Sequence, residues 1–275
     1  MNPWCVGGIV FAAFLILLAV TYAILMMPVK RYGREAYKGI KYAHRGLHGA
    51  GVPENSLEAF RLAVENGFGI ELDVHTIKDG TAVVFHDATL LRMVGVDKPL
   101  RELTFDELSG YSLDSSEWCI PTFDEVLKLV GGRVPLMVEL KQDAGESGVA
   151  TAAAELLKNY EGDYMVESFN PFTLAEFARE MPDVKRGILS QKFTIKPEHR
   201  TLKFFLAQHL LLNIVCKPDF IAYNHKDGRF LPLRFIKKIF NAPTIAWTVR
   251  SAEEEKIAYE NGFDSIIFEN YIPEK

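Results

Sequence analysis

From residue 40 onward, short apolar segments alternate with segments whose apolar residues follow helical spacing. The short segments, which we expect to be strands, are residues 40–43, 69–74, 81–85, 134–140, 165–169, 184–189, 220–223, 244–249 and 265–268. The intervening segments, which we expect to be helices, are residues 56–67, 122–130, 150–159, 172–180, 201–215, 233–240 and 252–261. Strands that alternate with helices form a parallel sheet, because each helix carries the chain back to the edge where the strands begin.

The number of strands and the length of this region match one closed barrel. About eight strands in residues 40–275 is the size of a (β/α)8 TIM barrel, which typically has roughly 250 residues. Residues 87–120 break the alternation, so we expect a small insertion after the second strand. A doubly wound sheet is the alternative fold, but it lacks the support of a glycine-rich nucleotide loop. We therefore predict an α/β fold, a TIM barrel.

The first residues of the chain are not those of a globular domain. Residues 1–29 contain no charged side chain, and residues 4–27 are a nearly unbroken apolar run. A helix of this length crosses a hydrocarbon core of about 30 Å. A cleaved signal peptide is the alternative, but it needs a positively charged start and a shorter apolar segment. We predict a retained transmembrane anchor at residues 1–29, in contact with membrane lipid.

The charges after this apolar run indicate its orientation. Residues 30–39 form a basic juxtamembrane linker that contains Lys30, Arg31, Arg34 and Lys38, with Glu35 as its one acid. The positive-inside rule then places residues 40–275 in the cytoplasm, on a single-pass protein of the cell membrane. Too few residues follow Phe268 for an eighth helix, so we expect the linker to cover the seam between the last and first strands.

Composition excludes some partners and compartments. The net charge of −5 argues against a nucleic-acid-binding protein, which usually has a basic face. Outside the apolar run the cysteines are Cys119 and Cys216, which do not form a disulfide framework. We expect a small-molecule substrate.

Polar residues with catalytic potential are concentrated at the ends of the predicted strands. His44 and His86 follow the first and third strands, and Glu71 and Asp73 alternate along the second. Alternate residues of a strand point to the same side, so these two carboxylates share one face. Glu139 and Lys141 repeat this spacing on the next strand, and carboxylate oxygens are the ligands that Mg²⁺ and Ca²⁺ prefer. The pattern favours metal-assisted hydrolysis.

The order of the motifs resembles one enzyme family. HRG at residues 44–46, PENS at 53–56, ExD at 71–73, KDG at 78–80 and HD at 86–87 together resemble the glycerophosphodiester phosphodiesterases. The resemblance covers about residues 40–270. It implies a divalent cation on Glu71, Asp73 and Glu139, and acid–base roles for His44 and His86.

Further residues are assigned from their chemistry or from weaker matches. Arg45 and Lys141 suit the binding of phosphate oxygens. Glu54 and Asn55 of PENS would support the site. Glu54 would line the metal site, and Asn55 would contact the residues that bind the metal rather than the metal itself. Trp247, in a segment similar to the family's late WTV strand, would form an apolar wall for the glycerol or belong to the barrel core.

Five histidines outside the motifs are not expected to take part in catalysis, and the residues after the last strand differ from the family pattern. We interpret His75 as a polar filler, and His48, His199, His209 and His225 as surface or packing residues. The family's common Thr-Asp after the last strand reads Phe268-Glu269-Asn270 here.

The resemblance implies hydrolysis of glycerophosphodiesters to sn-glycerol 3-phosphate and an alcohol. Alternatives are a lysophospholipase D that acts on membrane lysolipids, and a catalytically silent membrane-tethered binding module. We expect the anchor to meet the barrel at its N-terminal face, opposite the site, which favours soluble substrates. Exposure of Phe204 and Leu211, in the apolar segment 201–215, beside the site would reverse that preference.

Overall fold

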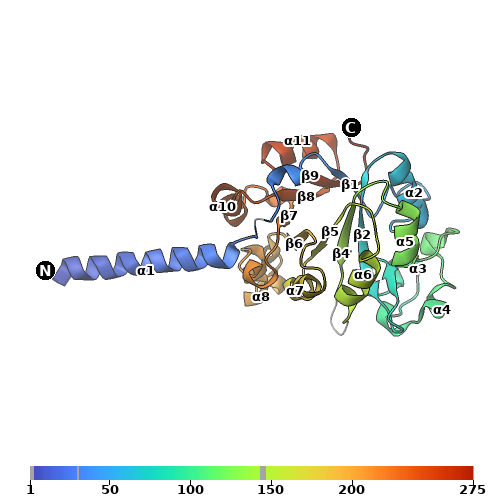
Figure 1. Cartoon of the computed structure of the whole chain (residues 1–275), viewed down its shortest axis with the longest axis horizontal. Coiled ribbons are helices and arrows are strands. Elements are labelled where there is room, and N and C mark those ends of the chain that lie inside the picture. The colour runs from blue at the N-terminus through green and yellow to red at the C-terminus, as the bar shows by residue number, and fades with distance from the viewer. Residues whose placement is uncertain (1–2, 30, 143–146, 275) are drawn as a thin grey trace.

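A computed structural model describes residues 3–29, 31–142 and 147–274 (Figure 1). Met1, Asn2 and Lys30 of the predicted anchor and linker, and Lys275 of the predicted barrel, lie outside the described residues. The parallel strands are β1 Lys41–His44, β2 Gly69–Thr76, β4 Leu136–Leu140, β5 Tyr164–Ser168, β6 Arg186–Ser190, β7 Phe220–Asn224, β8 Thr244–Val249 and β9 Ser265–Phe268. Because β1 pairs with both β2 and β9, the sheet closes into a barrel, and the predicted TIM barrel is confirmed.

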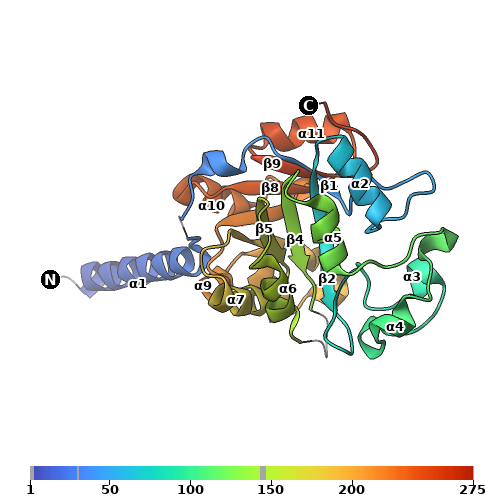
Figure 2. The same cartoon turned by 45° about the vertical axis from the view of Figure 1, so that its right-hand side comes forward.

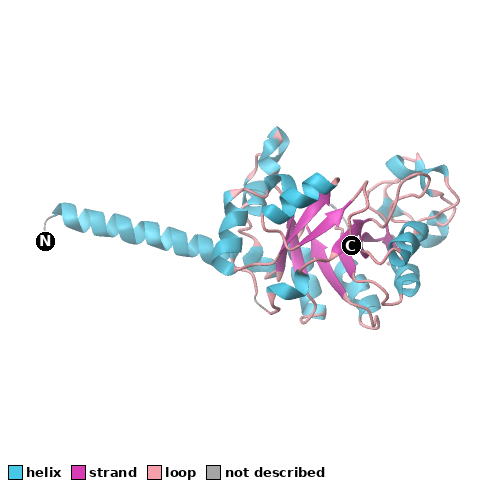
Figure 3. Ribbon diagram, turned by 90° about the horizontal axis from the view of Figure 1, so that it is seen from above, coloured by secondary structure: helices cyan, strands magenta, loops and turns pink. Residues whose placement is uncertain are grey.

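Helices surround the strands, as Figure 3 shows from above. They are α2 Leu57–Glu65, α5 Phe123–Val130, α6 Val149–Leu157, α7 Pro171–Glu180, α8 Leu202–Gln208, α9 Asn213–Cys216, α10 Leu231–Phe240 and α11 Ala252–Glu260. Short 3-10 helices lie at Arg34–Tyr37, Leu100–Glu102, Leu113–Ser115, Phe193–Ile195, Pro197–His199 and His225–Asp227. An apolar core fills the layer between strands and helices and includes Phe60, Val126, Phe177 and Ile236.

The helices begin where the sequence offers capping side chains. Ser56 Oγ accepts a hydrogen bond from the Ala59 amide at 3.1 Å, which caps the start of α2. Thr122 and Glu125 form a reciprocal capping box at the start of α5. These local signals explain why the helix positions are readable from the sequence.

One predicted helix is wrong in its extent. Residues 201–215 do not form a single helix but two short ones, α8 and α9, separated by a turn in which Leu210 has a φ of +59°. The turn buries Leu210 and Leu211, which are 1% and 8% exposed, against the core. The turn therefore packs both leucines into the barrel core.

The insertion lies between β2 and α5, where the sequence predicted it, and appears at the lower right of Figure 2. Its first strand, β3 Ala82–Val84, runs antiparallel to β2 and is not part of the barrel ring. Two short helices follow, α3 Leu91–Val94 and α4 Phe105–Leu108. The insertion has its own apolar cluster, formed by Ile77, Val83, Phe85, Leu90, Leu100, Leu103, Leu108, Leu113 and Ile120.

The N-terminal helix α1 Pro3–Met26 extends away from the side of the barrel (Figure 1). Its residues Trp4–Met26 are long and apolar enough to cross a membrane, and almost all of them are exposed. Asn213 of α9 donates a 2.8 Å hydrogen bond to the Met26 carbonyl, and the ring of Tyr22 packs edge-on against Phe235 of α10 at 6.0 Å. The helix therefore contacts α9 and α10, and the chain after it runs to the N-terminal ends of the strands, where the Val29 amide donates to the Pro218 carbonyl, just before β7, at 2.9 Å.

The basic stretch after α1 is bound to the starts of barrel strands. Arg31 Nε donates to Asp219, just before β7, at 2.9 Å, and Arg34 Nε donates to Asp264, just before β9, at 2.6 Å. Tyr37 is fully buried and packs against Phe220 at the bottom of the barrel. The stretch thus closes the N-terminal end of the barrel instead of the seam.

Aromatic side chains cover the outside of the seam between β9 and β1. The rings of Phe68 and Phe268 meet edge-on at 5.0 Å, and Tyr271 packs on Phe268 at 5.8 Å. The residues after β9 therefore take the place of an eighth helix.

Candidate active site

Buried carboxylates gather at the C-terminal ends of three neighbouring strands. Asp73 of β2 is in register with Glu139 of β4, which is in register with Glu167 of β5. Glu71 precedes Asp73 by two residues on the same face of β2. All four side chains are buried. Burial of an ionised carboxylate costs free energy unless the group is paired with a cation or hydrogen-bonded, so buried acids in this number indicate a functional site.

Glu71, Asp73 and Glu139 form one compact group with two cationic side chains beside them. One oxygen of each carboxylate lies within 4.8 Å of the others, a spacing that could hold a metal ion. Lys141 Nζ is 3.1 Å from Asp73 Oδ1 and 2.9 Å from Glu139 Oε1, and Arg45 Nε is 3.2 Å from Asp73 Oδ2. The sequence-predicted metal and phosphate residues thus come together in one place.

The protonation of the group reflects this crowding. Burial, together with Asp73 and Glu139, raises the pKa of Glu71 well above its usual range. Burial also raises the pKa of Glu139, against the attraction of Lys141. Burial acts the same way on Asp73, but Lys141, Arg45 and His86 outweigh it and hold that pKa well below its usual range. Carboxylates buried this close together repel one another, and a bound cation would offset that repulsion.

The HRG loop places Arg45 over this group. Gly46 has a φ of +81°, and a Cβ there would lie 2.7 Å from the Ala59 carbonyl carbon, so glycine is required. The Arg45 amide donates to Glu71 Oε2 at 3.0 Å, and its guanidinium donates to Glu54 at 2.7 Å. Glu54 also accepts from Arg92 of the insertion, at 2.6 Å. Glu54 therefore lies outside the three-carboxylate group and holds Arg45, whereas the sequence suggested that it lines the metal.

Asn55 supports the group from behind. It is 1% exposed, and its Nδ2 donates to Asp73 Oδ2 at 2.8 Å. Its φ of +56° is a left-handed conformation that asparagine tolerates better than most residues. The PENS motif thus fixes the orientation of the Asp73 carboxylate.

Two histidines flank the carboxylates, each with an acid on its Nδ1 side. His44 Nε2 lies 4.0 Å from Glu71, and His44 Nδ1 lies 3.1 Å from Glu269. His86 Nδ1 lies 2.7 Å from Asp87, the second residue of the HD motif. Burial lowers the pKa of His44 even though Glu269 opposes the change. An acid at Nδ1 fixes the ring orientation and leaves Nε2 for chemistry.

No role was predicted from the sequence for Glu269, which replaces part of the family's Thr-Asp. Its carboxylate meets His44, lies 3.4 Å from His48 Nε2, and accepts from Arg250 Nε at 2.6 Å. Hydrogen bonds from His44 and His48 hold the pKa of Glu269 far below its usual range. His48, assigned to the surface or to packing, therefore lies at the edge of the site. An acid directly after the last strand was the available signal.

Glu167 is the second acid that the sequence analysis missed. Its Oε2 has no hydrogen-bond partner among the described residues, and burial raises its pKa well above the usual range. The signal was its position, one residue before the end of β5, in register with Glu139.

An aromatic row begins at Trp247 of β8 and leads away from the carboxylates. Trp247 meets Phe169 edge-on at 5.5 Å, Phe169 meets Phe193 at 6.1 Å, and Phe193 meets Phe204 at 5.3 Å. Trp247 also packs on the apolar cluster inside the barrel. Its position fits both sequence-based interpretations, as core residue and as wall of the site.

The other histidines pack away from the carboxylate group. His75 is fully buried, with Nε2 3.3 Å from the His86 carbonyl, so it lies behind His86. His199 packs on Phe204 and His209 on Phe205, with ring centres 4.2 and 4.1 Å apart. His225 is buried, 3.4 Å from Glu254.

Known proteins are similar to this chain over most of its length. Residues 44–272 match the Glycerophosphoryl diester phosphodiesterase family. The chain is 30% identical over 246 residues to a glycerophosphodiester phosphodiesterase of Caldanaerobacter subterraneus subsp. tengcongensis, covering 84% of this chain and 93% of the relative. It is 28% identical over 172 residues to a lysophospholipase D of Rattus norvegicus, covering 58% of this chain and 52% of that one.

A solved structure has the same fold. It is an Oleispira antarctica phosphodiesterase in complex with the product sn-glycerol-3-phosphate, with a TM-score of 0.70 and 23% identity, covering 86% of this chain and 94% of the other. The chain therefore belongs to the glycerophosphoryl diester phosphodiesterase family and is an enzyme of that class.

Proposed function

We propose that this enzyme hydrolyses glycerophosphodiesters to sn-glycerol 3-phosphate and an alcohol, with one divalent cation, Mg²⁺ or Ca²⁺, held by Glu71, Asp73 and Glu139. The observation that carries the proposal is the group of three buried carboxylates within 4.8 Å, flanked by His44 and His86. The donor set consists of carboxylate oxygens alone, which fits a hard cation. A cation held there would supply Lewis-acid polarisation of a phosphoryl oxygen and positive charge to offset the charge of the transition state.

His44 and His86 carry the proton transfers. Hydrolysis of a diester needs one group that removes a proton from the attacking oxygen and one that protonates the leaving alkoxide. Glu269 and Asp87 hold the two rings through Nδ1, so each ring can exchange a proton at Nε2. Arg45 and Lys141, both in contact with Asp73, supply N–H donors to the phosphate oxygens.

Trp247 forms the apolar wall for the glycerol, and the aromatic row that starts there favours a second candidate function. Beyond that row the chain exposes large apolar side chains, among them Phe172 at 65%, Ile195 at 63% and Leu202 at 72%. An acyl chain would find apolar contacts along such a surface. A lysophospholipase D activity on lysolipids, the activity in the name of the Rattus norvegicus relative, is therefore the alternative.

The domain organisation that supports this function is a transmembrane anchor at residues 1–29, a linker at 30–39 and the catalytic barrel at 40–275. The apolar α1 and the basic residues after it support a single-pass protein of the cell membrane with a cytoplasmic barrel. Phe204 is partly buried and Leu211 is 8% exposed, so the exposure that would favour embedded lipids is not found at these two residues. Soluble diesters remain the preferred substrates.

The test is turnover by the full chain in detergent. Glycerophosphocholine and lysophosphatidylcholine would be compared with Mg²⁺, with Ca²⁺ and with a chelator. We expect metal-dependent release of choline from glycerophosphocholine and loss of activity in the chelator. Faster turnover of lysophosphatidylcholine would establish the second candidate, and absence of turnover of either substrate would indicate a silent binding module.

Metal binding needs a measurement of its own. Glu71→Gln and Asp73→Asn each remove one anionic oxygen ligand, so we expect weaker metal affinity by calorimetry. Glu71→Gln should change the unfolding temperature little, whereas Asp73→Asn also loses the ion pairs with Arg45 and Lys141 and should lower it. Glu65→Gln, an exposed acid at the end of α2, is the matched control. Full activity in the chelator, or unchanged affinity in both site variants, would remove the cation from the proposal.

A further inference from the structure

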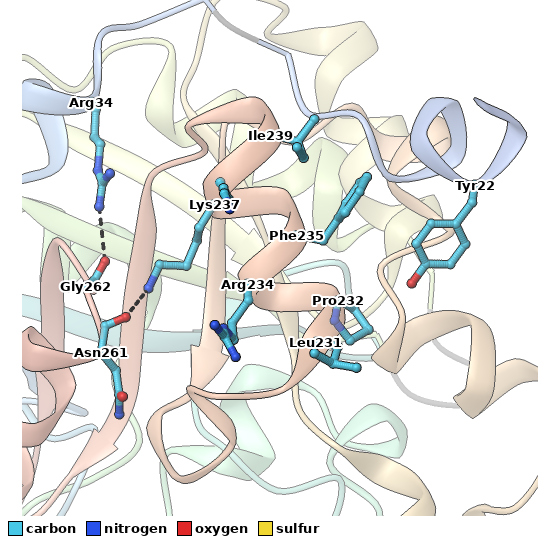
Figure 4. Close-up of a pocket in the computed structure, with 11 residues that line it drawn as sticks. Tyr22, Arg34, Leu231, Pro232, Arg234, Phe235, Lys237, Ile239, Asn261 and Gly262 are labelled. Carbon is cyan, nitrogen blue, oxygen red and sulfur yellow. Dashed lines mark hydrogen bonds between the residues drawn. The ribbon is translucent and has the colours of Figure 1, made fainter. Parts of the chain in front are cut away.

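A groove with a cavity volume of about 740 Å³ lies where α1 meets α10 (Figure 4). Its apolar side chains include Tyr22 at the end of α1, and Leu231, Phe235 and Ile239 on α10. Leu231 and Ile239 are 71% and 56% exposed, although both are large and apolar. Figure 4 shows Phe235 and Pro232 on the side towards Tyr22. The apolar part of the groove is thus continuous with the end of the apolar helix.

The opposite part of the groove is cationic. Arg34, Arg234, Lys237 and Lys238 line it, and no lining residue is an acid. Arg34 is paired with Asp264, but no carboxylate of the described chain lies within 4.0 Å of Arg234, Lys237 or Lys238 in an ion pair. Lys237 Nζ donates to the Asn261 carbonyl at 2.6 Å, and burial, together with Arg34, lowers its pKa to about 8. The groove therefore has excess positive charge.

We propose that this groove binds an anionic glycerophospholipid of the membrane that α1 enters, with the phosphate at Arg234, Lys237 and Lys238 and the acyl chains against Leu231, Phe235 and Ile239. The inference rests on the proposed membrane anchoring, because α1 then ends where lipid headgroups lie. An anionic lipid matches a groove with cations and no acids, whereas the cation of a zwitterionic headgroup would find no partner there. Apolar side chains beside the cations match a lipid better than a free phosphate.

The groove is separate from the active site. α10 lies outside the barrel between β7 and β8, and none of the groove residues is among those assigned to metal, phosphate or proton transfer. Binding there would hold the barrel side-on to the membrane without occupying the site. Loss of lipid binding and loss of catalysis can therefore be told apart.

The experiment is native mass spectrometry of the full chain in a neutral detergent, titrated with dioleoylphosphatidylglycerol or dioleoylphosphatidylcholine. We expect tighter binding of the anionic lipid, and about 30-fold weaker binding of it in the double variant Arg234→Gln/Lys238→Gln, since each cation near an anionic lipid is worth roughly 1 kcal/mol. Both residues are exposed, so the variant is expected to fold. Lys128→Gln/Lys158→Gln, exposed lysines near α5 and α6, is the matched control.

Equal affinity for the two lipids, or unchanged affinity in the double variant, would overturn the proposal. Displacement of the anionic lipid by inorganic phosphate at the same concentration would show that the groove recognises phosphate alone and would overturn the lipid assignment. Hydrolysis of glycerophosphocholine, measured on the same samples, is expected to be equal in wild type and variant. Absence of hydrolysis in the wild type would count against the proposed function and leave the lipid result standing.

Discussion

Strands β4 and β5 carry two successive layers of side chains inside the barrel, and the two layers differ in almost every property. In the lower layer Met137 is in register with Met165, and both belong to an apolar cluster at the bottom of the barrel. Two residues later, in the upper layer, Glu139 is in register with Glu167. Because a step of two residues keeps a side chain on the same face, each strand contributes first to packing and then to chemistry.

The difference between the layers is one of free energy as well as composition. Burying a methionine side chain stabilises a fold by about 1.5–3 kcal/mol. Burial of Glu139 and Glu167 instead raises the pKa of both carboxyls, which means that the folded chain holds them at a cost. The lower layer therefore raises the free energy of unfolding of the barrel, whereas the buried carboxyl groups of the upper layer lower it.

The largest effect is expected at the upper layer, in catalysis. His44→Ala and His86→Ala should each lower kcat by about 10²–10⁴, the usual contribution of acid–base catalysis, with an unchanged unfolding temperature. His209→Ala, a half-buried histidine that packs on Phe205, is the control and should keep its activity. Steady-state kinetics with glycerophosphocholine checks this, and a wild-type rate in either site variant would exclude that histidine from the mechanism.

The next effect is expected at the lower layer, in stability. Met165 is 4% exposed, so Met165→Ala leaves a cavity and should lower the free energy of unfolding by about 2–5 kcal/mol. Urea denaturation followed by circular dichroism measures it, with Met27→Ala, at an exposed methionine, as the control. If Met165→Ala instead lowered kcat at unchanged stability, the division between the two layers would be wrong.

The smallest effect is expected at Glu167, in the dependence of stability on pH without metal. Burial, with Glu139 and Asp73, raises the pKa of Glu167 above its unfolded value, so the cost of this residue grows as pH rises above about 4.3. Glu167→Gln removes that cost, and we expect its advantage in unfolding free energy to widen between pH 4 and pH 8. Urea titrations in chelator at several pH values test this, and an advantage that does not change with pH would contradict it.

The sequence predicted the fold well because its signals are local. Alternating strand and helix patterns, the caps at Ser56 and Thr122 and the irregular residues 87–120 each depend on near neighbours. The predictions failed where a distant contact decides the structure. The turn between α8 and α9 packs Leu210 into the core, and the linker is held at the N-terminal end of the barrel by Asp219 and Asp264, far from it in the sequence.

The same distinction holds for the site. His44, Glu71, Asp73 and Glu139 could be assigned from the sequence because they lie in dense motifs or alternate along predicted strands, and the structure brings them together. The contact between His44 and Glu269 could not be predicted in the same way, because the two residues are 225 positions apart and no local sequence pattern connects them. Glu167 was missed for another reason, since its meaning depends on the register between β4 and β5.

Ring closure has a consequence for the order of folding. Lys41 of β1 pairs with Ile266 of β9. The first strand of the barrel to be synthesised therefore cannot form its second set of strand hydrogen bonds until β9 has been synthesised. Contacts between such distant residues form slowly, and the unpaired edge of β1 is open to wrong partners meanwhile. The hydrogen bond between His44 and Glu269 lies at that same junction. A chain truncated before β9 would therefore lack both a closed barrel and the contact between Glu269 and His44, so activity should arise only after these residues have been synthesised.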